Sequence, residues 1–350
     1  MKKILINGNM GYIGPVVVSH FRSNYPEIQI IGFDTGFFAG CLANPNIFPE
    51  SNVDIQYFGD IRNFPQNILQ DVDAVIQLAA ISNDPMGNSF EIPTKEINND
   101  YAVEIAKLAK KMGVKNFVFA SSCSVYGAAG DEAKHEESEL NPQTAYAKSK
   151  IECEKGLKEL ADDKFVITAL RFATACGFSP RLRLDLVLND FVVSGLLNHK
   201  IEILSDGSPL RPLIHVKDMA RAIEWASIRI GQNGGDFLII NAGSNVWNYQ
   251  IKELAEKVRD IIGNVELTIN PNASIDNRSY RVDFGLFRKL APQFIPIITL
   301  DEAVNDLLEG IQTMNFVDTD FRNSHFIRLK TLNSLIVENR INKNLNWNKI

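Results

Sequence analysis

Short apolar runs alternate with amphipathic stretches along the first half of the chain. Continuous apolar runs are typical of strands buried on both faces of a parallel sheet, and apolar positions that recur about every 3.6 residues are typical of helices. The predicted strands are residues 3–7, 28–33, 54–58, 74–78, 116–120 and 165–171, and the predicted helices are residues 13–24, 97–111 and 145–160. Strands that alternate with helices predict right-handed crossovers and a doubly wound α/β domain.

After about residue 176 the alternation becomes less regular. We predict helices at residues 186–198, 218–230 and 249–262, and strands at residues 201–204, 238–241 and 265–269. A chain of 350 residues has room for two domains of about 150 residues each. The sequence therefore predicts a doubly wound domain over residues 1–175, to which some later segments return, and a smaller mixed α/β domain over residues 176–314. Residues 315–350 form an extension, predicted as a docked helix or another ordered segment.

Composition and charge narrow the class of protein. Lys and Arg total 36 against 42 Asp and Glu, a formal net charge of -6, so we expect no nucleic-acid partner. No apolar run approaches the ~20 residues of a membrane span, so we expect no membrane association. The four cysteines are scattered and the five histidines lack ligand spacing, which favours a reducing cytoplasmic location and no metal site.

A glycine-rich turn follows the first predicted strand and opens the first predicted helix. Gly8, Gly11 and Gly14 are spaced as GxxGxxG, which permits a tight turn and a close approach of the backbone to a pyrophosphate at the helix N-terminus. Asp34 ends the second predicted strand, where a carboxylate binds the adenine ribose and repels a 2′-phosphate. The sequence therefore predicts a dinucleotide site that prefers NAD to NADP. The alternative is a structural turn with an unrelated Asp34.

A tyrosine and a lysine four residues apart carry the candidate chemistry. Tyr146 and Lys150 share one face of a predicted helix. A phenol has a pKa near ~10, and a nearby ammonium together with a cationic nicotinamide ring lowers it. The phenolate can then take a proton from a hydroxyl while hydride leaves the same carbon. Ser122, near the end of the fifth predicted strand, is placed to hold the same oxygen.

These motifs occur in one order over about the first 310 residues. With them, the chain resembles the extended short-chain dehydrogenase/reductase family, in its nucleotide-sugar epimerase/dehydratase branch. The segments that carry the resemblance are residues 8–14, 34, 59–62, 78–80, 98, 121–127, 146–150, 170–177, 211–218 and 276–283. The resemblance implies a Rossmann-type NAD-binding domain, a nucleotide-sugar-binding domain, and a homodimer formed through residues 97–111 and 145–160.

The resemblance also implies roles for individual residues. Tyr146 would be the acid/base, Lys150 its partner and ribose anchor, and Ser122 the hydroxyl that orients the sugar. The residues implied to bind the cofactor are Gly8, Met10, Gly11, Tyr12, Ile13, Gly14, Asp34, Asp60, Ile61, Leu78, Ala79, Ala80, Asn98, Tyr146 and Lys150. The residues implied to bind the nucleotide-diphosphate sugar are Ser82, Asn83, Ser122, Cys123, Ser124, Thr174, Asn189, Arg211 and Arg278, with the two arginines on the diphosphate. Arg211 and Arg278 as plain surface arginines are the alternative.

Departures from the family pattern bear on the reaction. Sugar 4,6-dehydratases of this family carry an Asp-Glu pair after the hydroxyl residue, where this chain has Cys123 and Ser124, so that reaction is disfavoured. Thr174 stands where many 4-epimerases have Asn. Arg181 and Arg183 are also unusual; they would contact a phosphate or a subunit partner, or form a solvated face.

The leading functional prediction is an NAD-dependent nucleotide-sugar epimerase that oxidises and reduces C4. A 4-ketoreductase or C4 dehydrogenase of the same family would use the same three side chains and is the close alternative. A non-catalytic dinucleotide sensor is a distant one, because such a protein has little reason to keep Tyr146 and Lys150 beside Ser122.

Overall fold

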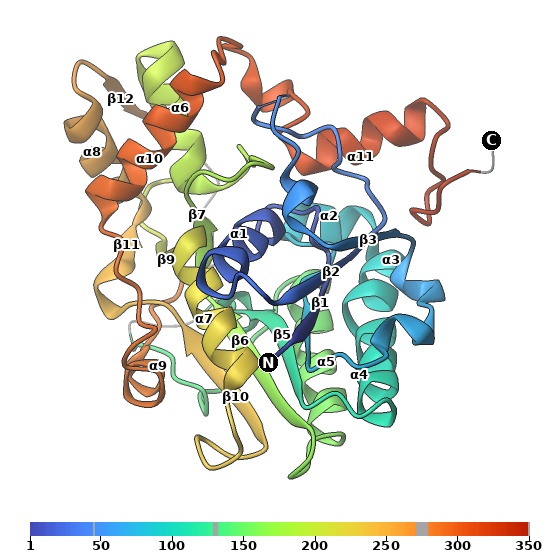
Figure 1. Ribbon diagram of the computed structural model, residues 1–350. Helices are drawn as coiled ribbons and strands as arrows, with labels where there is room; N and C mark the ends of the chain where they lie inside the picture. The colour runs from blue at the N-terminus through green and yellow to red at the C-terminus, as the bar shows by residue number, and fades with distance from the viewer. Residues whose placement is uncertain (45, 129–131, 271–278, 349–350) are drawn as a thin grey trace.

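A parallel seven-stranded sheet occupies the centre of the computed structural model, which describes residues 1–44, 46–128, 132–270 and 279–348 (Figure 1). Its strands lie in the order β10-β6-β5-β4-β1-β2-β3, and neighbouring strands are parallel throughout. The strands are β1 (Lys3–Asn7), β2 (Gln29–Asp34), β3 (Ile55–Phe58), β4 (Ala74–Gln77), β5 (Asn116–Ser122), β6 (Val166–Phe172) and β10 (Phe237–Ala242). The order β3-β2-β1-β4-β5-β6 is that of a Rossmann sheet, so the predicted fold class is confirmed.

Helices cover both faces of this sheet, which is why its strands are almost continuously apolar. One face packs against α1 (Gly14–Asn24), α7 (Val216–Ile228) and α9 (Gly285–Leu290). The other packs against α4 (Tyr101–Lys111) and α5 (Ala145–Lys158), with the short α2 (Asp84–Ser89) and α3 (Glu91–Lys95) beside them. The strand order reverses at β1, with β2 on one side and β4 on the other, and the crevice outside the carboxyl ends of the strands at such a point is where doubly wound sheets bind ligands.

The second part of the chain builds a smaller mixed unit beside the carboxyl edge. Its three-stranded sheet contains β7 (Thr174–Cys176), β9 (Leu210–His215) and β11 (Asn248–Gln250), and its two-stranded sheet contains β8 (Lys200–Ile203) and β12 (Glu266–Ile269). A separate apolar core joins them to α6 (Val187–Asn198), α8 (Ile251–Ile262) and α10 (Leu300–Thr313), which lie at the upper left of Figure 1. The strand β10 returns from this part to the large sheet.

The C-terminal extension contains the helix α11 (Arg328–Val337), which docks against the first domain. Beyond it, the Trp347 indole N–H donates to the Thr35 carbonyl (2.8 Å), and the Arg62 guanidinium donates to the carbonyls of Asn344 and Leu345 (both 2.8 Å). The extension is thus fixed beside the loops that follow β2 and β3. Within the described residues, no helix is long and apolar enough to cross a membrane.

Candidate active site

The candidate catalytic residues come together where β5 ends and α5 begins. Ser122 is the last residue of β5, and its hydroxyl accepts a hydrogen bond from the Ser124 backbone N–H (3.1 Å). Thr144 caps α5: its hydroxyl accepts from the Ala147 N–H (3.2 Å) and donates to the Asp84 carboxylate (2.6 Å). This cap fixes the first turn of α5, which carries Tyr146.

Tyr146, Lys150 and Ser122 form one contiguous group. The Tyr146 phenol is hydrogen-bonded to the Ser122 side chain. Lys150 is buried, and its ammonium donates to the Ala120 carbonyl (2.7 Å) while lying 5.6 Å from the centroid of the Tyr146 ring. The i, i+4 spacing on α5 therefore brings the ammonium beneath the phenol.

The electrostatics of this group follow from desolvation. Removal from water raises the pKa of Tyr146 to about 12, opposed by the Ser122 hydrogen bond and the positive charge of Arg183. The same effect lowers the pKa of Lys150 to about 8. Tyr146 thus needs additional positive charge nearby before it can act as a base at neutral pH, and a cationic nicotinamide ring would provide it.

A buried ion pair holds α5 against the sheet. Glu154 lies one turn beyond Lys150, and its carboxylate accepts two hydrogen bonds from Arg171 of β6 (2.9 and 2.7 Å) and one from the Ser121 hydroxyl (2.6 Å). Arg171 also donates to the Tyr126 hydroxyl (3.1 Å). The pair couples the helix carrying Tyr146 to the strand ends beside Ser122.

The glycine-rich turn has the shape of a dinucleotide cradle. Gly8 has φ of +82°, and a Cβ there would collide with the backbone of Ala79; a Cβ at Gly14 would collide with Asn9. No side chain caps the N-terminus of α1, so its first-turn N–H groups remain suited to phosphate. The Asp34 carboxylate accepts from the N–H groups of Met10 (3.0 Å) and Gly36 (2.8 Å), which fixes it at the end of β2. These residues fit NAD.

The other predicted cofactor residues line the same edge or support it. The Gly11 N–H donates to the Gly8 carbonyl. Ile13 and Leu78 pack against the apolar core beneath α1 and α7, and Ala79 packs against the core beneath α4 and α5. Ala80 is half-buried. The Tyr12 hydroxyl donates to the Gly177 carbonyl, and Ile61 is buried beside Asp60, which pairs with Arg62. Asn98 lies in the π-helical turn η4 (Glu96–Asp100), and its amide bonds both backbone groups of Ile81 and the Ser149 hydroxyl. Asn98 therefore joins the loop after β4 to the helix of Lys150.

Among the predicted substrate residues, three hydroxyl or amide groups lie near the catalytic group. The Ser82 hydroxyl accepts from Arg183 (3.2 Å), and Asn83 caps α2 and donates to Asp185 (2.8 Å). The Ser124 hydroxyl is buried and has no hydrogen-bond partner among the described residues. Cys123 differs: it is fully buried in the core, and its thiol donates to the Arg171 carbonyl. Cys123 is therefore not proposed as a substrate contact.

The remaining predicted substrate residues belong to the second part of the chain. Thr174 begins β7 and pairs with Leu213. Arg211 donates to the Leu210 carbonyl (2.9 Å) and lies 5.5 Å from the centroid of the Tyr280 ring. The Asn189 amide is buried and bonded to backbone groups of Gly177 and Arg183, so it shapes this segment. Arg278 lies outside the described residues.

Sequence reasoning singled out Arg183 but gave no role to three other side chains near this site, namely Asp185, Tyr280 and Arg328. Arg183 is buried and forms an ion pair with Asp185 (2.9 Å), so a solvated face at this position is wrong. The RxRxD pattern at residues 181–185 was the available signal. Tyr280 is buried, lies under the Arg211 guanidinium, and is close enough to Tyr146 for the two groups to interact electrostatically.

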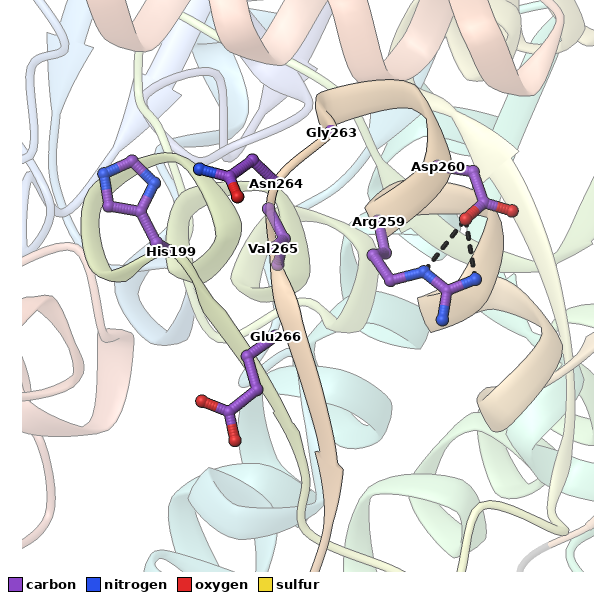
Figure 2. A pocket seen from close by; sticks show the side chains of 7 residues that line it. All are labelled: His199, Arg259, Asp260, Gly263, Asn264, Val265 and Glu266. Carbon is purple, nitrogen blue, oxygen red and sulfur yellow. Dashed lines mark hydrogen bonds and ion pairs between the residues drawn. The ribbon is translucent and has the colours of Figure 1, made fainter.

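A surface hollow elsewhere on the molecule contains none of the predicted site residues. Figure 2 shows it between His199, at the end of α6, and the turn that joins α8 to β12. An exposed ion pair between Arg259 and Asp260 (2.7 Å) lies at its side. The candidate site is therefore defined by the strand ends and not by this hollow.

Known proteins with a similar sequence or fold include NAD-dependent enzymes that act on nucleotide sugars. A model of the NAD dependent epimerase/dehydratase family matches residues 4–243. A UDP-glucose 4-epimerase of Streptomyces lividans is 27% identical over 283 residues, covering 75% of this chain and 81% of that protein. MoeE5, solved with NAD and either UDP-glucose or UDP-glucuronic acid, has a TM-score of 0.75 and 22% identity, covering 89% of this chain and 99% of its own. The NDP-hexosamine 5,6-dehydratase TunA also has a TM-score of 0.75 and 22% identity, covering 91% and 100%.

The family match includes the glycine-rich turn, Ser122, Tyr146 and Lys150, and it extends through β10. NAD, the cofactor expected from the sequence, agrees with the cofactor of this family. The match covers more than half of the chain and follows the order of motifs on which the resemblance rested. The chain belongs to the NAD-dependent epimerase/dehydratase family of enzymes.

Proposed function

We propose that this enzyme is a nucleotide-sugar epimerase that inverts C4 of a nucleotide-diphosphate sugar. The observation that carries the proposal is the contiguous group of Ser122, Tyr146 and buried Lys150 at the carboxyl end of β5. The likeness to a UDP-glucose 4-epimerase supports this reaction class. The cradle at Gly8 and Gly14 supports the binding of a dinucleotide.

In the proposed reaction, the phenolate of Tyr146, stabilised by the ammonium of Lys150, takes the proton of the C4 hydroxyl and becomes the neutral phenol. The Ser122 hydroxyl, already bonded to the phenol, orients the same sugar oxygen. Bound NAD supplies reversible hydride transfer at C4. The ketosugar then rotates in the site, so that the opposite face of its C4 carbonyl is presented for reduction. Tyr146 returns its proton to the C4 oxygen. The enzyme then regains its starting protonation state.

Substrate binding is proposed to divide between the two parts of the chain. Ser82, Asn83 and Ser124 are proposed to face the sugar, because they surround the catalytic group from the ends of β4 and β5. Arg211 and Arg278 are proposed to hold the diphosphate, for which the planar guanidinium is suited. A homodimer through α4 and α5 is a further proposal.

A 4-ketoreductase or C4 dehydrogenase would use the same three side chains and differs in the fate of the cofactor. A 4,6-dehydratase is not proposed, since burial raises the pKa of the Cys123 thiol and no carboxylate occupies residues 123 and 124. Purified enzyme should contain bound NAD and should convert a nucleotide sugar without added cofactor. A requirement for added NADH, consumed in stoichiometry with the product, would reject the epimerase in favour of the reductase.

A further inference from the structure

Three arginines from two distant parts of the chain lie together beside the candidate active site. Arg181 and Arg183 lie in the loop between β7 and α6, and Arg328 begins α11 in the C-terminal extension. All three are buried, with exposed fractions of 1%, 6% and 1%. The Nη2 atom of Arg328 donates to the Arg181 carbonyl (2.8 Å), which joins the extension directly to this loop.

Only two of the three charges are balanced by ion pairs within the described residues. Arg181 pairs with Glu50 (2.8 Å), and Arg183 pairs with Asp185 (2.9 Å). The Arg328 guanidinium lies 4.6 Å from the centroid of the Phe38 ring, and none of the ion pairs in the described chain includes it. Its Nη1 atom is buried and has no hydrogen-bond partner among the described residues.

A buried guanidinium without a counter-ion is unfavourable, because its charge has lost water and gained nothing equivalent. The charges that face Arg328 are those of Arg181 and Arg183, which repel it, and of Asp185, which is already paired. The group therefore holds one positive charge in excess. A bound anion would complete the pairing.

The group also borders the reacting end of the site. Arg183 donates to the Ser82 hydroxyl (3.2 Å), and its positive charge acts on the phenol of Tyr146. We propose that Arg183 and Arg328 form a subsite for a carboxylate carried by the sugar, so that the enzyme acts on an acidic nucleotide sugar. A carboxylate brings one negative charge, which matches the excess, whereas a phosphate monoester brings about 1.5 to 2. The proposal rests on the proposed nucleotide-sugar function and names the substrate class.

The diphosphate of the cofactor is the other source of anionic oxygens, because Arg183 also acts on Tyr12 in the glycine-rich turn. Calorimetry on full-length, NAD-loaded Tyr146→Phe protein separates the two sources without turnover. We expect UDP-glucuronic acid to bind about tenfold more tightly than UDP-glucose. Arg328→Gln should remove that preference, leave UDP-glucose affinity within about twofold, and leave NAD affinity within about twofold.

Two further variants keep the result interpretable. Arg328→Met retains an unbranched side chain against Phe38 and should lose the same preference, so the test does not depend on one variant folding. Arg340→Gln is the matched control, since Arg340 lies in the same extension with an exposed side chain, and it should bind both sugars like the parent. Equal affinities in the parent, equal losses for both sugars in the variants, or a loss confined to NAD would each overturn the acidic-sugar subsite. None of these outcomes depends on whether the reaction is epimerisation.

Discussion

The ammonium of Lys150 lies 5.6 Å from the centroid of the Tyr146 ring while it is held by the Ala120 carbonyl. This hydrogen bond anchors the charge to the end of β5. Burial shifts the pKa values of the two groups in opposite directions: it raises the pKa of the phenol and lowers that of the ammonium. A second cation beside Lys150 is therefore needed to make phenolate accessible, and the nicotinamide ring of bound NAD would provide it.

Removal of the phenol oxygen should stop the reaction while leaving cofactor binding intact. Tyr146→Phe keeps the ring but cannot accept or return a proton, and general acid–base catalysis contributes about 10²–10⁴-fold. We expect turnover to fall by at least that factor and NAD affinity to change by less than about threefold. Steady-state kinetics and calorimetry measure the two effects. Tyr101→Phe, in α4, is the control, and normal turnover in Tyr146→Phe would refute the assigned mechanism.

The dependence of kcat/KM on pH should change when the positive charge of Lys150 is removed. Lys150→Met removes the charge that stabilises phenolate, so the pKa of Tyr146 rises and a smaller fraction is deprotonated at any given pH. We expect the rate at pH 7.5 to fall about 10²-fold or more. The rising limb of kcat/KM against pH should move to higher pH. Lys148→Met, on the exposed side of the same helix, should leave the profile unchanged. A Lys150→Met profile with the parent's apparent pKa would contradict this role.

Cofactor preference should depend on Asp34. Its carboxylate is fixed by the N–H groups of Met10 and Gly36 at the end of β2, where a 2′-phosphate would meet a negative charge. Asp34→Ala should weaken NAD binding and shift the ratio of NAD to NADP affinity toward NADP by about tenfold. Both cofactors are titrated on the same variant, so a general loss of stability cancels in the ratio. An unchanged ratio would show that Asp34 does not contact the ribose.

Stability should depend on the ion pair behind the catalytic helix. Glu154→Gln leaves the Arg171 guanidinium buried without its counter-ion, which costs about 3–5 kcal/mol of unfolding free energy. Denaturant unfolding measures this change. Glu152→Gln, exposed on the same helix, should change it by less than about 0.5 kcal/mol. Equal effects of the two substitutions would mean that the Glu154–Arg171 pair is not a net support of the fold.

The large sheet could be predicted because its strands are buried on both faces and therefore appear in the sequence as continuous apolar runs. The strand β1 occupies residues 3–7 as predicted, and α6 and α8 lie within a residue or two of their predicted limits. The short strand β9 was missed because Arg211, Pro212 and His215 interrupt its apolar pattern. The helix α10 was also missed, although Thr299 and Glu302 form a capping box that the sequence displays.

The candidate site was predictable only where its residues share a motif. Tyr146 and Lys150 need only helical periodicity to meet, whereas Arg183 and Arg328 meet because the extension folds back over a distant loop. Burial of a long charged side chain depends on such packing and has no local signature. The homodimer through α4 and α5 stays a prediction. The exposed positions of these helices carry charged side chains, namely Glu104, Lys107, Lys110, Lys148, Glu152 and Lys155, and they give no apolar stripe from which an interface could be read.

Conversion of a nucleotide sugar labelled with deuterium at C4 tests the central claim most directly. The enzyme as purified, without added cofactor, is incubated with C4-deuterated UDP-glucose and, separately, with C4-deuterated UDP-glucuronic acid, and the products are followed by NMR. The account predicts the C4 epimer of at least one substrate, with deuterium retained at C4 and no net change in NADH absorbance. Transfer of the C4 deuterium to bound NAD without its return to the sugar, or no change at C4 in either sugar, would contradict it.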